Sequence, residues 1–159
     1  MRMGGSRGDT RRAFERSLVN AETTLILLDS EVAVREAHGF RPWDQLRVSD
    51  GWQRPDGASE AHCHLMVQCM ESWFLADREI VAEYFGRGFH DSSLARNPRV
   101  EQVPKADVLR SLERATRNTK KKGYSKGAHA FQVLARLDPE KIENASPWAK
   151  RFFDHLRAL

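Results

Sequence analysis

The sequence predicts a single α/β domain in which a buried sheet is flanked by about five helices. Its 159 residues suffice for one domain with a real core, and 40% hydrophobic with 30% charged residues is a globular balance. Residues 23–29 form a continuous apolar run of strand length that ends in an acid. Apolar residues at helical spacing recur from the middle of the chain to its C-terminus, which predicts several amphipathic helices.

The first half of the chain is expected to hold one helix and two strands. Asp9 is a suitable N-cap for a helix that ends near Asn20. The apolar run at 23–29 predicts a central strand covered on both faces, and residues 64–68 predict a second strand. Between the two strands, residues 30–60 have the glycines, prolines and tryptophans of a long packed loop, with a helical turn expected at its Trp43–Leu46 segment.

The second half of the chain is predicted to be helical. A helix with a buried apolar face runs from about Cys69 to Phe85 and is ended by two glycines. Pro104 suits the first turn of the next helix, and residues 131–137 belong to a third. Ser146-Pro147 opens the last helix, so residues 104–159 are the helical C-terminal part of the same domain.

Composition excludes several classes of protein. No apolar run approaches the roughly 20 residues that cross a bilayer, and residues 1–12 lack the apolar core of a secretory signal. We therefore expect a cytoplasmic protein whose Cys63 and Cys69 are free buried thiols. Serine-hydrolase, zincin, P-loop, dinucleotide-binding and zinc-finger motifs are missing from the sequence. The net charge of +4 is compatible with phosphate binding but does not by itself predict it.

Three acids follow the predicted strands. Asp29 and Glu31 lie directly after the first strand, where ligands of open α/β sheets bind, and are candidate ligands of Mg²⁺ or Mn²⁺. The alternative is that they only solvate the start of a loop. Glu71 follows the second strand. Asp77 falls within the apolar face of the same predicted helix, where it either caps a new segment after a break or takes part in a site.

Residues 119–129 form a basic segment with two glycines and a tyrosine. Such a loop can hold a phosphate through lysine side chains and backbone N–H groups, but a solvated basic turn after a helix is the alternative. The candidate phosphate or nucleic-acid contacts of the chain are Lys105, Lys121, Lys122, Tyr124, Lys126 and His129. His62 and His64 share a strand face, a spacing that some zinc sites use, yet an ordinary strand start is favoured because a third ligand is not evident nearby.

Four segments give the chain a resemblance to a known family. They are Leu27-Leu28-Asp29-Ser30-Glu31, residues 64–77, residues 104–109 and residues 124–129. The chain resembles a bacterial family, the domain of unknown function 4276, which is regarded as Toprim-like. The resemblance extends from about Gly4 to the C-terminus, and its most specific part is the segment Met-Glu-Ser-Trp-Phe-Leu-Ala-Asp at residues 70–77.

The resemblance implies a Rossmann-like or Toprim-like, partly parallel sheet within one domain over residues 1–159. Thr24–Leu28 and Leu65–Val67 are then neighbouring parallel strands, with the helix from Met70 packed on them. The family's first element, a strand followed by Glu-Gly, has no counterpart near Gly4. Because two strands are few for this many helices, the resemblance implies an N-terminal truncation.

The resulting functional hypothesis is a Mg²⁺-dependent nuclease or phosphoryl-transfer domain. Asp29, Glu31 and Glu71 are its candidate catalytic residues, and the first two are the candidate metal ligands. Family members are often encoded near ATPases of phage-defence and mobile-element systems, which implies an ATPase partner and a nucleic-acid target. The alternative hypothesis is a catalytically degenerate module that binds nucleic acid or protein through the basic segment. A divalent-metal titration separates the two.

Overall fold

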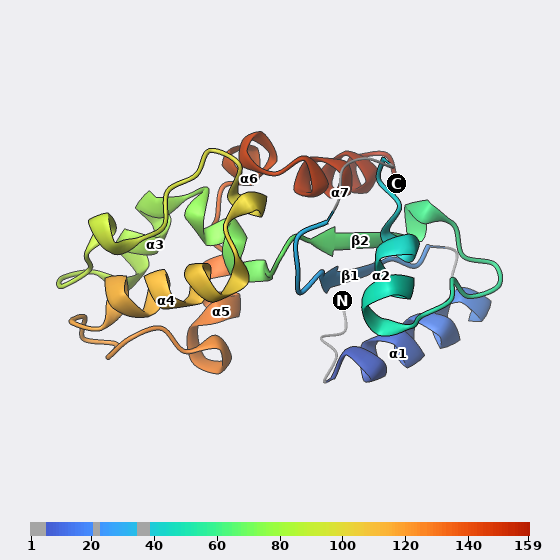
Figure 1. The fold of residues 1–159 in the computed structure, drawn as a ribbon, viewed down its shortest axis with the longest axis horizontal. Helices are drawn as coiled ribbons and strands as arrows, with labels where there is room; N and C mark the ends of the chain where they lie inside the picture. The colour runs from blue at the N-terminus through green and yellow to red at the C-terminus, as the bar shows by residue number, and fades with distance from the viewer. Residues whose placement is uncertain (1–5, 21–22, 35–38) are drawn as a thin grey trace.

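The computed structural model of the chain describes residues 6–20, 23–34 and 39–159, and it has a mixed α/β fold (Figure 1). Strands β1 (Ile26–Asp29) and β2 (Cys63–Met66) lie side by side and parallel, with Leu28 opposite Leu65. The predicted parallel pair is therefore confirmed, although β1 begins later than expected and β2 lies slightly earlier in the chain than predicted.

Both faces of this small sheet are covered, which explains the continuous apolar run of its sequence. Ile26 and Leu28 of β1 lie in a core with Leu65 of β2. Leu27 and Met66 alternate with them and pack against a second core on the other face.

The first core lies between the sheet and two helices, α1 (Arg7–Asn20) and α2 (Pro42–Asp50). Phe14 comes from α1, and Trp43 and Leu46 come from α2. The expectation of a single turn at Trp43–Leu46 was too short. Pro42 begins a longer helix, and Gly51, in the left-handed conformation with φ 69°, ends it.

The second core is helical and occupies the other half of the molecule (Figure 1). Its α-helices are α3 (Arg78–Phe85), α4 (Lys105–Thr116), α5 (Lys126–Leu134) and α6 (Pro139–Ala145). The 3₁₀ helices of this half are η3 (Met70–Leu75), η4 (Asp91–Ser93) and η5 (Val100–Gln102), whereas a further one, η2 (Glu60–His62), lies directly before β2. Phe74 of η3 and Leu112 of α4 are fully buried in this core. No helix among the described residues is long and apolar enough to cross a bilayer.

The expectation of one continuous helix from Cys69 to Phe85 was wrong, and the alternative of a break with a new segment from Arg78 is confirmed, because the chain leaves helical geometry at Asp77 (φ −123°, ψ 67°). Asp77 occupies the N-cap position of α3, but its side chain makes no capping bond there. Its buried carboxylate instead accepts the N–H of Asp138 at 3.0 Å and the ammonium of Lys141 at 2.8 Å. Asp77 therefore ties the start of α3 to the start of α6.

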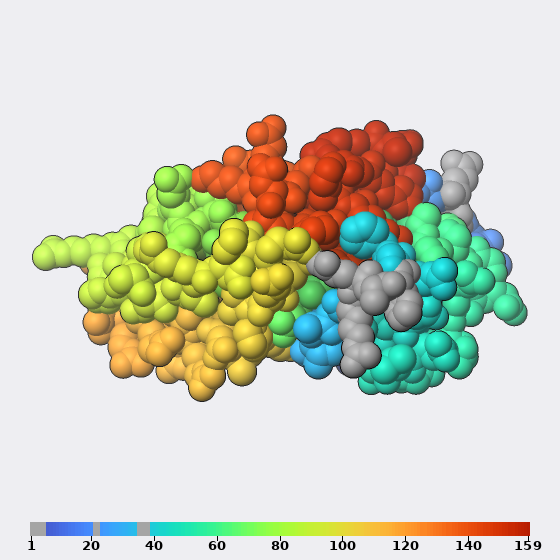
Figure 2. All heavy atoms as spheres, turned by 45° about the horizontal axis from the view of Figure 1, so that its top comes forward, coloured from blue at the N-terminus to red at the C-terminus, as the bar shows by residue number. Residues whose placement is uncertain are grey.

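The last helix, α7 (Pro147–Arg157), joins the two cores. Ser146 caps it as predicted, since its hydroxyl oxygen accepts the N–H of Ala149 at 3.0 Å. Trp148 belongs to the sheet core, and its neighbour Ala149 belongs to the helical core. Figure 2 shows the red C-terminal segment lying along the top of both halves.

Candidate functional site at the end of the parallel strands

Asp29 is the last residue of β1, and its carboxylate lies where the two strands end. The pairing continues past the strand, because the N–H of Glu31 donates to the carbonyl oxygen of Gln68 at 2.8 Å. Asp29 Oδ1 accepts the backbone N–H of Met70 at 2.8 Å, at the first residue of η3. The ends of both strands and the start of η3 are thus fixed around one carboxylate.

Glu71 is completely buried, yet its carboxylate reaches the same place. Lys126 Nζ lies 3.2 Å from Asp29 Oδ2 and 3.5 Å from Glu71 Oε1, so one ammonium bridges both acids. The hydroxyl of Tyr124 donates to Glu71 Oε1 at 2.7 Å. Glu71 Oε2 is buried without a hydrogen-bond partner in the described part of the chain. Because a buried carboxylate oxygen without a donor is costly, this cluster is the strongest candidate site.

The electrostatics of this acidic cluster (Asp29, Glu71, Tyr124 and Lys126) follow from burial. Burial raises the pKa of Asp29, and the charge of Glu71 adds to this effect, against the opposing ammonium of Lys126. Burial disfavours the charge of Lys126, but the two carboxylates outweigh burial and raise its pKa. Burial and the hydrogen bond to Glu71 also raise the pKa of the Tyr124 hydroxyl, which therefore keeps its proton. With both acids ionised, two carboxylates and one ammonium leave one negative charge uncompensated.

Glu31, which the sequence paired with Asp29, binds a different lysine. It adopts a left-handed backbone conformation with φ 67°. Its carboxylate forms an ion pair with the ammonium of Lys105 and lies 3.9 Å from Arg7 Nη1. In the described residues no three His, Cys, Asp or Glu side chains are grouped so that they could hold a metal ion. The acids that share a cation position are therefore Asp29 and Glu71.

The remaining predicted phosphate contacts, Lys121, Lys122 and His129, belong to the helical half, and Lys121 and His129 both lie beside Tyr84. Lys121 Nζ lies 4.7 Å from the centre of the Tyr84 ring, and Lys122 is exposed in the turn with φ 58°. His129 Nδ1 accepts the N–H of Ser125 at 3.0 Å, and burial together with the charge of Lys121 lowers the pKa of His129. Of the six residues predicted to contact phosphate, Tyr124 and Lys126 lie at the acidic cluster and Lys105 lies at Glu31.

Sequence reasoning missed Arg7, at the start of α1. Its guanidinium donates to the carbonyl oxygen of Asp29 at 2.5 Å and to both carboxylate oxygens of Asp50, at 3.0 and 2.8 Å. Arg7 lies in a segment rich in glycine and arginine, where no periodicity or motif identifies it as a site residue. Only the packing of α1 against β1 makes its role visible.

The two histidines that shared a predicted strand face have separate partners. His62 Nδ1 accepts the N–H of Ser59 at 2.8 Å. His64 is buried, with Nδ1 3.0 Å from Arg151 Nη1 and Nε2 3.0 Å from His155 Nδ1. Burial and the neighbouring guanidinium lower the pKa of His64 to about 4. This arrangement favours the ordinary structural interpretation of the pair over a zinc site.

Comparison with known proteins gives one match. A family model described as Domain of unknown function (DUF4276) matches residues 2–157. No curated protein and no solved structure matches the chain. The family description names no activity, so any functional conclusion depends on the residues of the site.

Proposed function

The chain belongs to the family Domain of unknown function (DUF4276), and we propose that it is a Toprim-like domain whose acidic cluster performs Mg²⁺- or Mn²⁺-dependent phosphoryl transfer of the nuclease type. One observation carries the proposal. The Lys126 ammonium lies between Asp29 Oδ2 and Glu71 Oε1, at 3.2 and 3.5 Å. Carboxylates from two distant elements therefore face one shared position that suits a cation.

The residues present fit a hard divalent cation. Mg²⁺ in phosphoryl-transfer sites is commonly bound by one or two carboxylates together with substrate phosphate oxygens, and Asp29 and Glu71 would supply these carboxylates. The partnerless Glu71 Oε2 and the uncompensated negative charge of the cluster both favour additional positive charge. Glu31, which is ion-paired with Lys105, is the proposed third acid of the site, and it would act through Lys105 and not as a direct ligand of the cation.

The side chains around the acids have distinct proposed roles. A bound cation would neutralise charge on the phosphoryl group. Lys126, whose side chain is 56% exposed, would turn from the carboxylates to a phosphate oxygen. Arg7 and Lys105 extend the positive side of the site. Tyr124 holds Glu71 in place through its hydroxyl, which stays protonated because its pKa is raised.

The experiment is a calorimetric titration of Mn²⁺ into wild type, Asp29→Asn and Glu71→Gln, together with hydrolysis of bis(4-nitrophenyl) phosphate. Glu79→Gln is the matched control, since Glu79 on α3 is ion-paired but 86% exposed. We expect both site variants to bind Mn²⁺ at least tenfold more weakly and to lose hydrolysis, while the control keeps both. Equal heats from wild type and Asp29→Asn would reject the metal site.

A second candidate function is a binding module without catalysis. It is favoured by the observation that each acid of the site already has a lysine partner, Lys126 for Asp29 and Glu71 and Lys105 for Glu31. The exposed lysines at 120–122 would then contact a nucleic acid or a protein. A cytoplasmic location and an ATPase partner accompany either proposal, the latter through the family resemblance alone. Nucleic-acid binding that needs no divalent metal would support this second function.

A further inference from the structure

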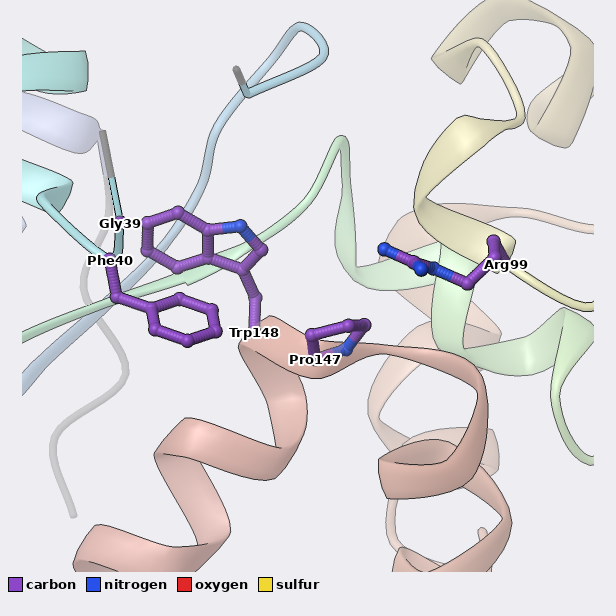
Figure 3. Close-up of a pocket in the computed structure, with 5 residues that line it drawn as sticks. All are labelled: Gly39, Phe40, Arg99, Pro147 and Trp148. Carbon is purple, nitrogen blue, oxygen red and sulfur yellow. The ribbon is translucent and has the colours of Figure 1, made fainter. Parts of the chain in front are cut away.

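A cavity of about 620 Å³ lies beside the start of α2, the helix that Figure 1 shows next to the two strands. Glu60, one of the residues that line it, comes just before β2, whereas Asp29 and the acidic cluster lie where both strands end. A ligand of this cavity is therefore independent of the proposed phosphoryl-transfer site. The smaller cavity at the start of α7 differs, because its arginine, Arg99, already has an interaction within the protein (Figure 3).

Three arginines line the cavity beside α2, namely Arg41, Arg47 and Arg54. The side chain of each is more than half exposed, and each meets a carboxylate only at long range. Asp44 lies 3.9 Å from Arg41 and 3.6 Å from Arg47, and Glu60 lies 3.7 Å from Arg54. These N···O distances are longer than hydrogen bonds. Because exposed ion pairs of this kind contribute little, the three guanidinium groups can turn to another anion at small cost.

Arginines that hold other parts of this protein together are bound differently. Arg7 donates to both carboxylate oxygens of Asp50, at 3.0 and 2.8 Å. Arg78 donates to the carboxylate of Asp91 and to the carbonyl oxygen of Ala95, both at 2.9 Å. In the described part of the chain, the three cavity arginines donate no such hydrogen bond. Since each guanidinium has several N–H donors, their gathering around one cavity favours a ligand rich in acceptor oxygens.

The aromatic residue of the cavity is already fixed in place. Trp43 is only 3% exposed, and its indole N–H donates to the carbonyl oxygen of Ser59 at 2.9 Å. Its ring also packs against that of Phe14, with the ring centres 5.8 Å apart. These contacts hold the start of α2 against the segment that precedes β2. A ligand therefore has to order only the arginine side chains, which limits the entropy that binding costs.

We propose that this cavity binds a small molecule with two or three linked phosphate groups, whose oxygens the three arginines contact. A guanidinium offers a planar fork of donors that matches phosphate oxygens. Linked phosphates also carry the charge needed to replace Asp44 and Glu60 as partners of the arginines. The volume lies within the range of roughly 300–1,000 Å³ that is typical of small-molecule sites. The same two carboxylates interrupt the positive surface, which favours a compact ligand over a long nucleic acid.

The test is a calorimetric titration of the wild-type protein in buffer with EDTA, so that no divalent metal contributes and the acidic cluster is not involved. The ligands are tripolyphosphate, ATP, inorganic phosphate, citrate and a ten-residue oligothymidylate. We expect tripolyphosphate or ATP to bind saturably and at least tenfold more tightly than phosphate or citrate. The tighter of the two identifies the source as an inorganic oligophosphate or a nucleotide. Absence of binding by both, equally tight citrate, or tighter oligothymidylate would overturn the proposal.

Variants locate the site. Arg47→Gln and Arg54→Gln should each weaken binding of the tighter triphosphate at least fivefold. Asp44→Asn should strengthen binding, because it removes a carboxylate that competes for the arginines. The matched control is Arg110→Gln on α4, since Arg110 is also exposed and also paired with an acid three residues earlier, Asp107. Unchanged affinity in either cavity arginine variant, or an equal loss in the control, would reject this cavity as the binding site.

Discussion

Replacement of Lys126 by methionine is the sharpest perturbation of the acidic cluster. The substitution keeps most of the apolar stem of the side chain and removes the ammonium that bridges Asp29 and Glu71. Burial has already raised the pKa of Asp29, and the loss of its cationic neighbour raises this pKa further. Two carboxylates then face each other without a compensating charge.

The size of the effect follows from the distances and from exposure. At the 3.2 Å that separates Lys126 Nζ from Asp29 Oδ2, an ion pair is worth about 5 kcal/mol at an effective dielectric constant of about 20 and about 1 kcal/mol in water. Lys126 is 56% exposed, so solvent screens the pair and the lower end applies. Because Glu71 is fully buried, we expect the free energy of unfolding at pH 7 to fall by about 1–2 kcal/mol.

The loss of stability in Lys126→Met should depend on pH in a definite direction. An acid whose pKa is raised in the fold contributes stability that is present at low pH and lost as the pH rises through its folded pKa. Lys126→Met should therefore lose most stability near pH 7 and less near pH 5, as measured by urea unfolding at both pH values. Lys150→Met is the matched control, because this lysine is 58% exposed and paired with the exposed Asp154. A loss that grows on acidification, or no loss at all, would refute the reasoning.

Three further predictions concern other groups. Tyr124→Phe removes the donor to the buried Glu71 and should lower the free energy of unfolding by about 1–3 kcal/mol in urea; an unchanged midpoint would contradict this. His64 should titrate near its lowered pKa of about 4 in an NMR titration of the ring, so that its contribution to stability is full above the ordinary value of 6.5 and lost as the pH falls through about 4; a midpoint above 6 would contradict its buried neutral state. The double variant Lys121→Ala, Lys122→Ala should reduce the slope of the logarithm of nucleic-acid affinity against the logarithm of salt concentration by roughly 1.5. An unchanged slope would show that this turn is only solvated surface.

The parallel pair of strands could be predicted because its physical cause is local. Residues 26–28 are all apolar, and a strand covered on both faces needs such a run. The start of α7 could also be predicted, since the N-cap Ser146 and the first helical residue Pro147 act within one helical turn. The extent of α2 was missed because Pro42 and Gly51, counted as loop residues, are the two ends of a helix.

The break at Asp77 could not be predicted in detail, because its cause lies far along the chain. The partners of its carboxylate, Asp138 and Lys141, are more than 60 residues away. An apolar face with helical spacing is compatible with a continuous helix and with two short ones.

The membership of the acidic cluster was largely foreseen, but its pairing was not. Asp29, Glu71, Tyr124 and Lys126 were all candidates from the sequence, and the structure brings them together. The sequence favoured Asp29 with Glu31, because both acids come at the end of the first predicted strand, where ligands of open α/β sheets bind. Glu31 has already left the strand geometry, with φ 67°, and its carboxylate binds Lys105.

The division of α7 between two cores has a consequence for how the protein is made. Phe14, β1 and β2 leave the ribosome early, but the indole of Trp148 that completes their core belongs to the C-terminal helix. Domains fold as units during synthesis, so the sheet half, although translated first, has to wait until nearly the whole chain has emerged. During that interval its two strands expose apolar side chains and unpaired edges, which is the kind of surface that chaperones bind on nascent chains. Because Ala149 of the same helix belongs to the helical core, both cores are completed only after α7 has been synthesised.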